Sequence, residues 1–276
     1  METKRSDKQT RNVRSCDKVR PFLRYPGSKY NASKYIEPFW RNIQIEEYRE
    51  PFLGSGAIFF KKPVSDFSIL NDIDEELINC YRIIKNKDYL DGFIEDIKNI
   101  KPDKIWFEKL KKMEVKSDYE RALRYFLINR TAYSGIMNSP NWGFHPVKSV
   151  QPDKWPERIM KASEKLQLNV QIESLHFSEI IQKESDKNVW LFLDPPYFSA
   201  DQKRAYAKSF VLKDHFDLHD ILKNTPFKFC LTYDNCDEIK ELYSWANIHE
   251  IEWMYHTANS NVTQRKKGKE LIITNY

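Results

Sequence analysis

The sequence lacks the features of membrane-spanning proteins, of secreted proteins and of small proteins stabilised by disulfides or metal ions. No apolar run approaches the roughly 20 residues of a membrane helix, and the polar N-terminus has no apolar stretch typical of a secretory signal. The 4 cysteines are scattered without a C-x-x-C pair, which argues against a disulfide framework or a zinc site. We therefore expect a protein of the reducing cytoplasm that uses neither a membrane nor a metal.

Glycine is also scarce, with 7 residues among 276, whereas 41% of the residues are hydrophobic and 14% are aromatic. This composition fits one large or two modest globular domains with a real core. The net charge is +5, and residues 1–20 carry most of it, with seven Lys or Arg against three acids. We expect residues 1–20 to be a basic disordered tail, or alternatively an arm that contacts phosphates without sequence preference.

Two strand-turn-helix units follow the tail. In residues 48–62 (YREPFLGSGAIFFKK) a short strand closes at an acid and a proline, Gly54 and Gly56 make a tight turn, and a helix begins at Ala57. In residues 68–84 (SILNDIDEELINCYRII) a strand ends at Asn71 and Asp72, and an amphipathic helix follows. Two such units in series indicate an open α/β sheet with crossover connections.

The middle of the chain has a different pattern. Residues 117–130 (SDYERALRYFLINR) predict a long helix, and residues 131–156 form a loop rich in Pro, Asn and Gly. Strand-like apolar runs then resume at residues 170–172, 189–193, 227–232, 248–253 and 271–274. A polar, basic segment joins the last two runs, which we expect to form an antiparallel pair that closes the sheet.

The strongest functional signal is residues 190–197 (WLFLDPPY), where a buried strand delivers Asp194, Pro195 and Tyr197 to its carboxyl end. A carboxylate and a stiffly held proline carbonyl can each accept one N–H of an exocyclic amine such as that of adenine. The nitrogen lone pair then becomes free for attack. The tyrosine ring offers a face for a base taken out of the duplex. The alternative is a plain turn that ends the strand.

A nucleoside fits the first glycine turn better than a triphosphate does. The G-K-[ST] of a Walker loop does not follow Gly54 and Gly56. Asp72, at the end of the next strand, is well placed to accept hydrogen bonds from two ribose hydroxyls. The alternative role for Asp72 is to cap the helix that follows.

Three segments in this order resemble the Dam-type DNA adenine-N6 methyltransferases of the α group. They are RYPGSK (24–29), EPFLGSG (50–56) and, after a long insert, DPPY (194–197). The resemblance covers residues 21–276, including the closing GKELIITNY (268–276). It implies an α/β fold: an S-adenosylmethionine-dependent methyltransferase (Rossmann-like) sheet with an inserted, mostly helical target-recognition domain. Residues 21–84 and 169–276 would form the catalytic domain, and residues 85–168 the DNA-binding domain.

The resemblance also implies how the cofactor S-adenosyl-L-methionine would be held. Tyr25 would lie against the cofactor, Lys29 would meet its methionyl end, and Asp72 would meet its ribose. Glu50 and Gly54 would shape the same pocket.

The target base would lie at the DPPY motif. Asp194, which also borders the cofactor, and the Pro195 carbonyl would hold the target amine. Tyr197 would stack on the flipped adenine.

Contacts with double-stranded DNA are implied at five further residues. Arg24 occupies a position that carries a basic DNA contact in the family. Residues 129–135 (NRTAYSG) are similar to the recognition-domain loop, so Arg130 would contact DNA and Tyr133 would wedge into the base stack or be a half-buried loop aromatic. Arg265 and Lys267, in the basic run before the last strand, would meet phosphates or simply be solvated.

Two departures from the family pattern are visible. Ser134 stands where many relatives have Asn, and the residues after Gly135 differ from the GATC-recognising form. His176 stands where some relatives carry an Asp that meets the cofactor's adenine, so a solvent-facing or core histidine is the expected role.

The sequence thus predicts a site-specific, adenine-specific DNA methyltransferase that acts as a monomer, with a cognate restriction endonuclease as a further partner. An RNA adenine methyltransferase and a non-catalytic DNA-binding relative are the alternatives. Protein-glutamine enzymes usually carry Asn, and cytosine-N4 enzymes Ser, where Asp194 stands. A metal nuclease is disfavoured because the carboxylates show no metal-ligand spacing.

Overall fold

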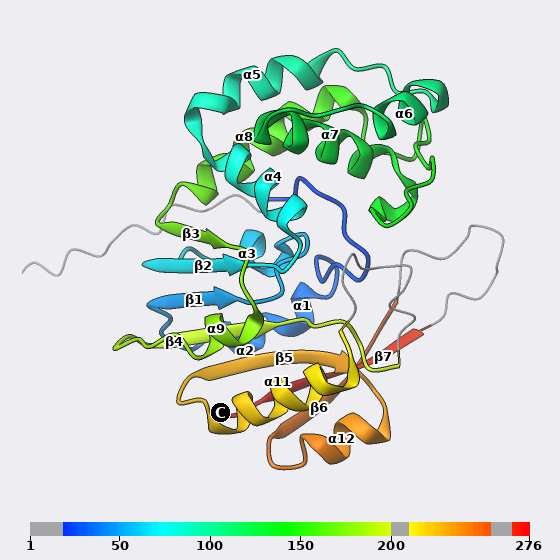
Figure 1. The fold of residues 1–276 in the computed structure, drawn as a ribbon. Helices are drawn as coiled ribbons and strands as arrows, with labels where there is room; N and C mark the ends of the chain where they lie inside the picture. The colour runs from blue at the N-terminus through cyan, green and yellow to red at the C-terminus, as the bar shows by residue number, and fades with distance from the viewer. Residues whose placement is uncertain (1–18, 200–209, 255–266) are drawn as a thin grey trace, which may run out of the picture.

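The computed structural model describes residues 19–199, 210–254 and 267–276 (Figure 1). In this range the chain forms a seven-stranded sheet in the order β3-β2-β1-β4-β5-β7-β6. The strands are β1 (Glu47–Glu50), β2 (Phe67–Asn71), β3 (Val170–Glu173), β4 (Val189–Leu193), β5 (Lys228–Asp234), β6 (Asn247–Met254) and β7 (Lys267–Thr274). Val19 is already buried in the core, so packing begins before the boundary expected at residue 21. The remainder of the expected tail, residues 1–18, lies outside the described residues.

The strand order creates a switch point between β1 and β4. Strands β1 to β5 run parallel, and the sheet grows from β1 through β2 and β3 on one side and from β4 to β5 on the other. Strand β7 lies antiparallel between β5 and β6, which confirms the antiparallel pair expected from the last two apolar runs. Open α/β sheets bind ligands where the connections diverge, outside the carboxyl ends of such strands.

Alternating side chains of the central strands pack in two hydrophobic clusters, one on each face of the sheet. On β4, Trp190 and Phe192 belong to one cluster, whereas Val189, Leu191 and Leu193 belong to the other. This division follows because successive side chains of a strand point to opposite faces. Because both faces of the sheet are covered here, all five side chains of β4 are buried, which agrees with its apolar sequence VWLFL.

Helices cover both faces of the sheet. The first cluster receives side chains from α1 (Ser33–Ile36), α2 (Pro38–Arg41), α3 (Ala57–Lys61) and α4 (Glu75–Lys85). The second receives them from α9 (Phe177–Ile181), α11 (Leu212–Asn224) and α12 (Asp237–Leu242). The predicted Rossmann-like α/β architecture is therefore confirmed.

The mostly helical insert gathers beyond the β3 edge of the sheet (Figure 1). It contains α5 (Lys87–Lys98), α6 (Lys104–Lys111), α7 (Asp118–Thr131), α8 (Trp155–Leu166) and short 3-10 turns at Tyr133–Gly135 and Pro152–Lys154. The side chains of Asn86, Asp103 and Ser117 accept backbone N–H groups at the starts of α5, α6 and α7. Each such cap stabilises its helix by about 1 kcal/mol. Helix α4 packs against α7 and so joins the insert to the sheet.

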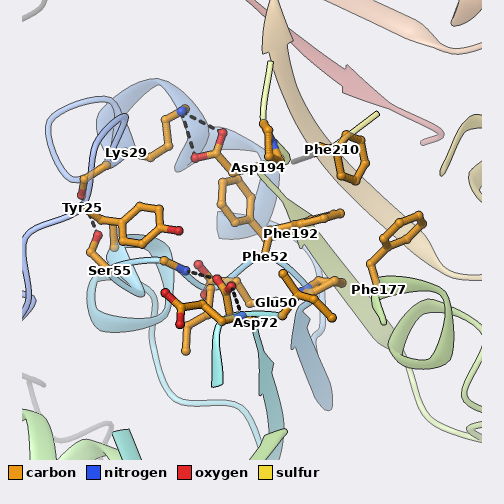
Figure 2. Close-up of a pocket in the computed structure, with 18 of the residues that line it drawn as sticks. Tyr25, Lys29, Glu50, Phe52, Ser55, Asp72, Phe177, Phe192, Asp194 and Phe210 are labelled. Atoms are coloured by element: carbon orange, nitrogen blue, oxygen red, sulfur yellow. Dashed lines mark hydrogen bonds and ion pairs between the residues drawn. The ribbon is translucent and has the colours of Figure 1, made fainter. Parts of the chain in front are cut away.

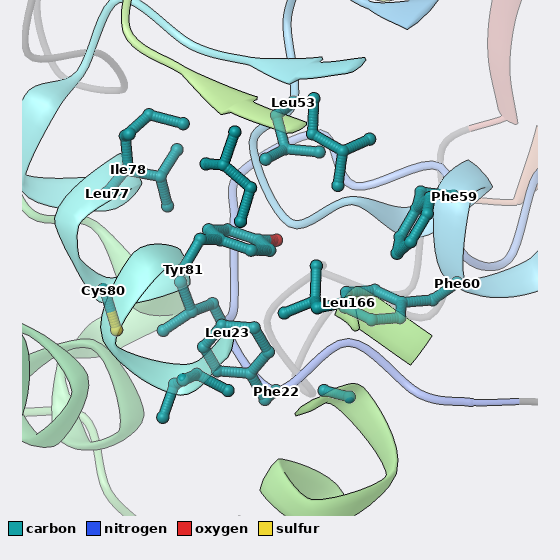
Figure 3. Close-up of a cluster of buried hydrophobic side chains, with 14 of the residues drawn as sticks. Phe22, Leu23, Leu53, Phe59, Phe60, Leu77, Ile78, Cys80, Tyr81 and Leu166 are labelled. Carbon is teal, nitrogen blue, oxygen red and sulfur yellow. The ribbon is translucent and has the colours of Figure 1, made fainter. Parts of the chain in front are cut away.

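Tyr81 of α4 supports the glycine turn that follows β1. Its fully buried ring lies 4.9 Å from the ring of Phe22, within the cluster drawn in Figure 3. Its hydroxyl donates to the Gly54 carbonyl at 3.2 Å. Gly56 has a φ of +63°, and a Cβ there would lie 3.1 Å from the Tyr81 hydroxyl. Core packing therefore fixes the shape of a turn that only glycine can form.

Candidate functional site

A cavity of about 200 Å³ opens at the switch point of the sheet (Figure 2). Its walls come from the segment before α1, the residues that follow β1, β2 and β4, and the start of α9. Six of the predicted site residues line it, namely Tyr25, Lys29, Glu50, Gly54, Asp72 and Asp194. The fold thus brings together side chains that are far apart in the sequence.

The glycine turn is held by Asp72 and covered by Tyr25. The Gly54 backbone N–H donates to Oδ2 of Asp72 at 2.9 Å. Gly54 has a φ of +47°, and a Cβ there would lie 2.9 Å from Cδ1 of Tyr25. The Tyr25 ring therefore lies directly on the turn, at a distance that only glycine permits.

Asp72 does not cap the helix that follows it. The cap of α4 is Asp74, whose carboxylate accepts the backbone N–H groups of Glu76 and Leu77 at 3.1 and 3.3 Å. Asp72 instead accepts the backbone N–H groups of Gly54 and Asp74. Burial raises the pKa of Asp72 to about 6, against the opposing effect of these two donors. The alternative role considered for Asp72 therefore belongs to its neighbour.

Glu50 is a second buried carboxylate, with only 2% of its surface exposed. Its Oε2 accepts the Tyr48 hydroxyl at 2.6 Å and the Phe59 backbone N–H at 3.3 Å. Burial raises the pKa of Glu50 to about 8, and the nearby charge of Asp194 acts in the same direction. Glu50 therefore holds its proton at neutral pH, and a cationic ligand in the cavity would favour its charged form.

Three phenylalanines form an aromatic wall of the cavity. Phe52 lies 5.4 Å from Phe177 and 5.7 Å from Phe210, and the last two rings are 5.6 Å apart (Figure 2). Such a wall suits a flat, largely apolar ring. His176 also lines the cavity, and its Nδ1 accepts the backbone N–H of Ser178 as the N-cap of α9.

Asp194 leaves the end of β4 with two fixed partners. The Lys29 Nζ lies 2.7 Å from Oδ1 and 2.9 Å from Oδ2, and the Thr232 hydroxyl donates to Oδ1 at 2.7 Å. The Asp194 side chain keeps 20% of its surface exposed, whereas Lys29 keeps 5%. Pro195, the next residue, is buried. Lys29 was expected at the methionyl end of a cofactor, and here it pairs with the DPPY carboxylate.

Tyr197 is half-buried, and both ends of its side chain are held. Its hydroxyl donates to Glu270 on β7, and the Lys29 Nζ lies over the ring at 4.8 Å from its centre. The backbone N–H groups of the two residues after Tyr197 donate to Asp234 at 3.0 and 2.9 Å. The DPPY motif is therefore tied to β5, to β7 and to the segment before α1.

A second cavity, of about 650 Å³, also has residues 24–29 in its wall. Its described charged residues are all cationic: Arg20, Arg24, Lys29, Lys34, Arg130 and Arg158. Burial, then Arg158 and Arg24, lower the pKa of Arg130 to about 9. Positive charge gathered in this way attracts anions such as phosphates.

Arg130 lies at the end of the long helix that residues 117–130 predict. Helix α7 continues to Thr131, so Arg130 lies in the last helical turn, 4% exposed, with its guanidinium 6.0 Å from the Trp155 ring. Its Nε has no hydrogen-bond partner among the described residues. Arg24 donates from its guanidinium to the Ala132 carbonyl at 3.0 Å, just beyond the helix.

Tyr133 begins the 3-10 turn that follows α7 and is 52% exposed. Its backbone N–H donates to the Asn141 carbonyl at 2.7 Å. A Cβ on Gly143 would lie 2.3 Å from the Tyr133 Cα, so two backbone segments are in close contact at Tyr133. An exposed aromatic ring thus projects from a firmly held backbone.

The structure leaves two predicted DNA contacts undescribed. Arg265 falls in residues 255–266, and Lys267 begins β7 but its side chain lies outside the described residues. Among the described side chains, no group of three His, Cys, Asp or Glu is arranged to hold a metal ion. None of the described helices has the length and apolar character needed to cross a bilayer.

Sequence reasoning missed the aromatic wall, Thr232 and Glu270. The three phenylalanines are ordinary apolar residues in the sequence, and only the fold places them around one cavity. Thr232 lies in a strand and offers no motif. Glu270 left one usable signal, because a carboxylate stands where the apolar pattern of β7 begins, in KGKELIIT.

Comparison with known proteins agrees with this geometry. The family model for D12 class N6 adenine-specific DNA methyltransferases matches residues 25–257. The type II methyltransferase M1.LlaDCHI of Lactococcus lactis subsp. cremoris is 29% identical, over 94% of this chain and 96% of the relative. For M.MjaIII, a type II methyltransferase of Methanocaldococcus jannaschii, the values are 27%, 94% and 99%.

A DNA adenine methylase of Serratia marcescens is 24% identical, over 92% of this chain and 98% of the relative. Among solved structures, the precorrin 8W decarboxylase of Methanobacterium thermoautotrophicum is 9% identical with a TM-score of 0.40, over 94% of this chain and 95% of that one. The match to the family model extends over most of the chain, and the chain therefore belongs to the D12 class N6 adenine-specific DNA methyltransferases.

Proposed function

We propose that this DNA adenine methyltransferase takes its methyl group from S-adenosyl-L-methionine and transfers it to an adenine flipped out of double-stranded DNA. One observation carries the proposal, namely the continuity of the first cavity. It is lined by Gly54 and Asp72 on one side and by Asp194 and Pro196 on the other. A nucleoside cofactor and a target amine can therefore meet in one partly enclosed space.

The cavity residues fit the cofactor. Asp72 is placed to accept hydrogen bonds from ribose hydroxyls, and the aromatic wall suits an adenine ring. Glu50 and Asp72 are buried carboxylates with raised pKa values, so a positively charged ligand would relieve the cost of their charge. Tyr25 and Gly54 shape the pocket, and Lys29 lies where it can reach a methionyl carboxylate. When bound, the cofactor supplies a methyl group on a positively charged sulfur.

The DPPY residues would handle the target amine. Asp194 and the Pro195 carbonyl each accept one N–H of the adenine amine, which directs the nitrogen lone pair toward the methyl group. A carboxylate is far too weak a base to remove a proton from a neutral amine before attack. Asp194 therefore stabilises the positive charge that grows on the nitrogen as the methyl group arrives. Tyr197 supplies the stacking face.

The basic cavity and Tyr133 form the proposed DNA side of the molecule. Arg24 and Arg130 would meet backbone phosphates, and burial without a hydrogen-bond partner for its Nε favours an anionic partner for Arg130. Exposed Tyr133 would wedge into the base stack beside the flipped adenine. Arg265 and Lys267 remain proposed phosphate contacts.

The order of the motifs supports assignment to the Dam-type α group, with residues 85–168 as the target-recognition domain. We also propose that the enzyme acts as a monomer in the cytoplasm. A cognate restriction endonuclease is a proposed partner, because curated relatives are named type II methyltransferases.

Calorimetry with S-adenosylmethionine in EDTA tests the cofactor site. Asp72→Ala should weaken binding by about 1–3 kcal/mol, the scale of lost hydrogen bonds to a charged group. Asp103→Ala is the matched control, because it removes the cap of α6, does not line the cavity and should lower stability more than affinity. No heat of binding to folded wild-type protein would refute the proposed cofactor, and equal affinities for wild type and Asp72→Ala would refute the role of Asp72.

A further inference from the structure

Lys29 lies between two carboxylates and against an aromatic ring. Its Nζ is 2.7 Å from Oδ1 of Asp194, 3.9 Å from Oε2 of Glu270, and 4.8 Å from the centre of the Tyr197 ring. The Tyr197 hydroxyl donates to Glu270, which closes the group. Lys29 and Glu270 are 4% and 1% exposed, so these contacts are shielded from water.

Glu270 stands where the strand pattern predicts an apolar side chain. Leu271 and Ile273 of β7 pack in the second hydrophobic cluster, and Ile272 packs in the first. Glu270 has the same parity as Ile272 and therefore faces the first cluster. Burying a carboxylate is costly unless it is paired and hydrogen-bonded. Its contacts with Lys29 and Tyr197 both lead to the DPPY motif.

Glu270 itself does not line the cavity in which Asp194 lies. It contacts the motif through Tyr197 and Lys29, and it is anchored in β7 opposite Asp234 of β5 and Ile251 of β6. Any influence on the reaction must therefore pass through the side chains that it holds.

We propose that Glu270 is a positioning residue for methyl transfer, which orients the Tyr197 ring and shares the Lys29 ammonium with Asp194. The proposal rests on the roles proposed above for Asp194 and Tyr197. If Lys29 had Asp194 as its sole carboxylate partner, the pair would be neutral. With an ionised Glu270 the three side chains would carry a net charge of −1, which would favour the positive charge that develops on the target nitrogen.

The same contacts fix the acceptor geometry. Glu270 holds the hydroxyl end of Tyr197, so the ring cannot rotate away from the position in which it would stack on a base. Lys29 is drawn toward both carboxylates at once, and the Thr232 hydroxyl also donates to Oδ1 of Asp194. Glu270 therefore completes a preorganised site before the target base enters.

The test compares Glu270→Gln with Glu250→Gln, which removes one negative charge from the neighbouring strand β6. Glu250 pairs with Lys240, and its side chain is 60% exposed, so its loss controls for a general change of charge. Full-length proteins transfer labelled methyl to DNA from a methylation-free host in single-turnover experiments. Calorimetry measures cofactor affinity, and thermal unfolding measures stability.

We expect Glu270→Gln to transfer methyl at least about tenfold more slowly, with cofactor affinity within about threefold of wild type. Glu250→Gln should stay within about twofold. Tyr197→Phe removes the hydroxyl that contacts Glu270. In the double variant the two losses should therefore combine to less than their product, because both act through one contact.

Three results would overturn the proposal. They are a near-normal rate for folded Glu270→Gln, an equal loss in Glu250→Gln, or a rate loss matched by parallel losses of cofactor affinity and stability. If Glu270→Gln does not fold, Tyr197→Phe decides alone, and an unchanged rate contradicts the proposal. Absence of transfer by the wild type would instead count against the proposed function.

Discussion

Glu50 and Asp72 are carboxyl groups buried where water is largely excluded. Their pKa values rise to about 8 and about 6, chiefly because burial penalises the ionised form. Asp194 adds to the rise at Glu50, so the acids of the cavity are coupled. A positively charged cofactor would lower both pKa values again. Burial of these two acids thus lowers the stability of the ligand-free protein and favours binding of a cation.

The raised pKa values of Glu50 and Asp72 predict how stability depends on pH. The folded protein holds the Glu50 proton up to about pH 8, whereas the unfolded chain loses it near the ordinary value of 4.5. The contribution of Glu50 to the free energy of unfolding should therefore be complete below pH 4.5. It should decrease as the pH rises toward 8. Asp72 contributes the same sign between 3.8 and about 6.

Glu50→Gln removes the titrating group and should flatten this slope. Relative to wild type, the variant should gain about 1–3 kcal/mol between pH 5 and pH 8, since one pKa unit corresponds to about 1.4 kcal/mol. Urea unfolding at a series of pH values measures the effect. If stability depended on pH as steeply in the variant as in wild type, Glu50 would not be the group responsible for the slope.

At the scale of elements, the glycine turn is where core packing and ligand binding meet. Tyr81 holds the turn from the core, and Tyr25 covers it from the cavity. Both contacts are tight because Gly54 and Gly56 adopt positive φ angles of +47° and +63°. A side chain on the turn would therefore affect the cofactor pocket directly.

Gly54→Ala should displace Tyr25 and weaken cofactor binding by at least about tenfold, because its Cβ would meet the Tyr25 ring at 2.9 Å. Gly92→Ala in α5 is the control, because its Cβ would meet just the Tyr119 hydroxyl, at 3.4 Å. That change should leave binding unaltered and stabilise the helix by about 0.5–1 kcal/mol. Equal cofactor affinities for the two variants would contradict the proposed role of Tyr25 in cofactor binding.

The elements show how far the sequence could predict the site. The sites at Gly54, Asp72 and Asp194 follow from local patterns, because each lies just after a strand and parallel strands end at one edge. The pairing of Lys29 with Asp194 could not be predicted, since it joins segments 165 residues apart. The burial of Arg130 also required the tertiary structure, because α8 brings Trp155 against the end of α7.

At the scale of the whole molecule, the insert and the sheet meet along residues 24–29. Arg24 contacts Asn129 and Ala132 of the insert, whereas Lys29, a few residues later, pairs with Asp194 of the sheet. The two cavities share Tyr25, Pro26, Ser28 and Lys29 in their walls. The proposed DNA side is therefore connected to the proposed chemical site by a short stretch of chain.

Tyr133→Ala should weaken DNA binding or change the methylated sequences, and leave cofactor affinity unaltered. The expected loss is about 1–3 kcal/mol, the scale of one aromatic stacking contact with a base. Tyr89→Ala is the matched control, because Tyr89 is 43% exposed on α5 of the same insert. Single-molecule sequencing of host DNA and DNA-binding titrations would detect the change. Unchanged DNA affinity and methylation pattern would refute the wedge.

The most direct test of the account is the methyl-transfer rate of Asp194→Asn. Asn keeps the shape and one acceptor but removes the charge that would stabilise the transition state, so the loss should fall on the rate. In single-turnover transfer of labelled methyl to DNA, we predict a decrease of at least about a hundredfold, with folding and DNA affinity retained. Tyr197→Phe, which keeps the stacking face, should lose much less than Tyr197→Ala. Near-normal transfer by Asp194→Asn would contradict the proposed mechanism.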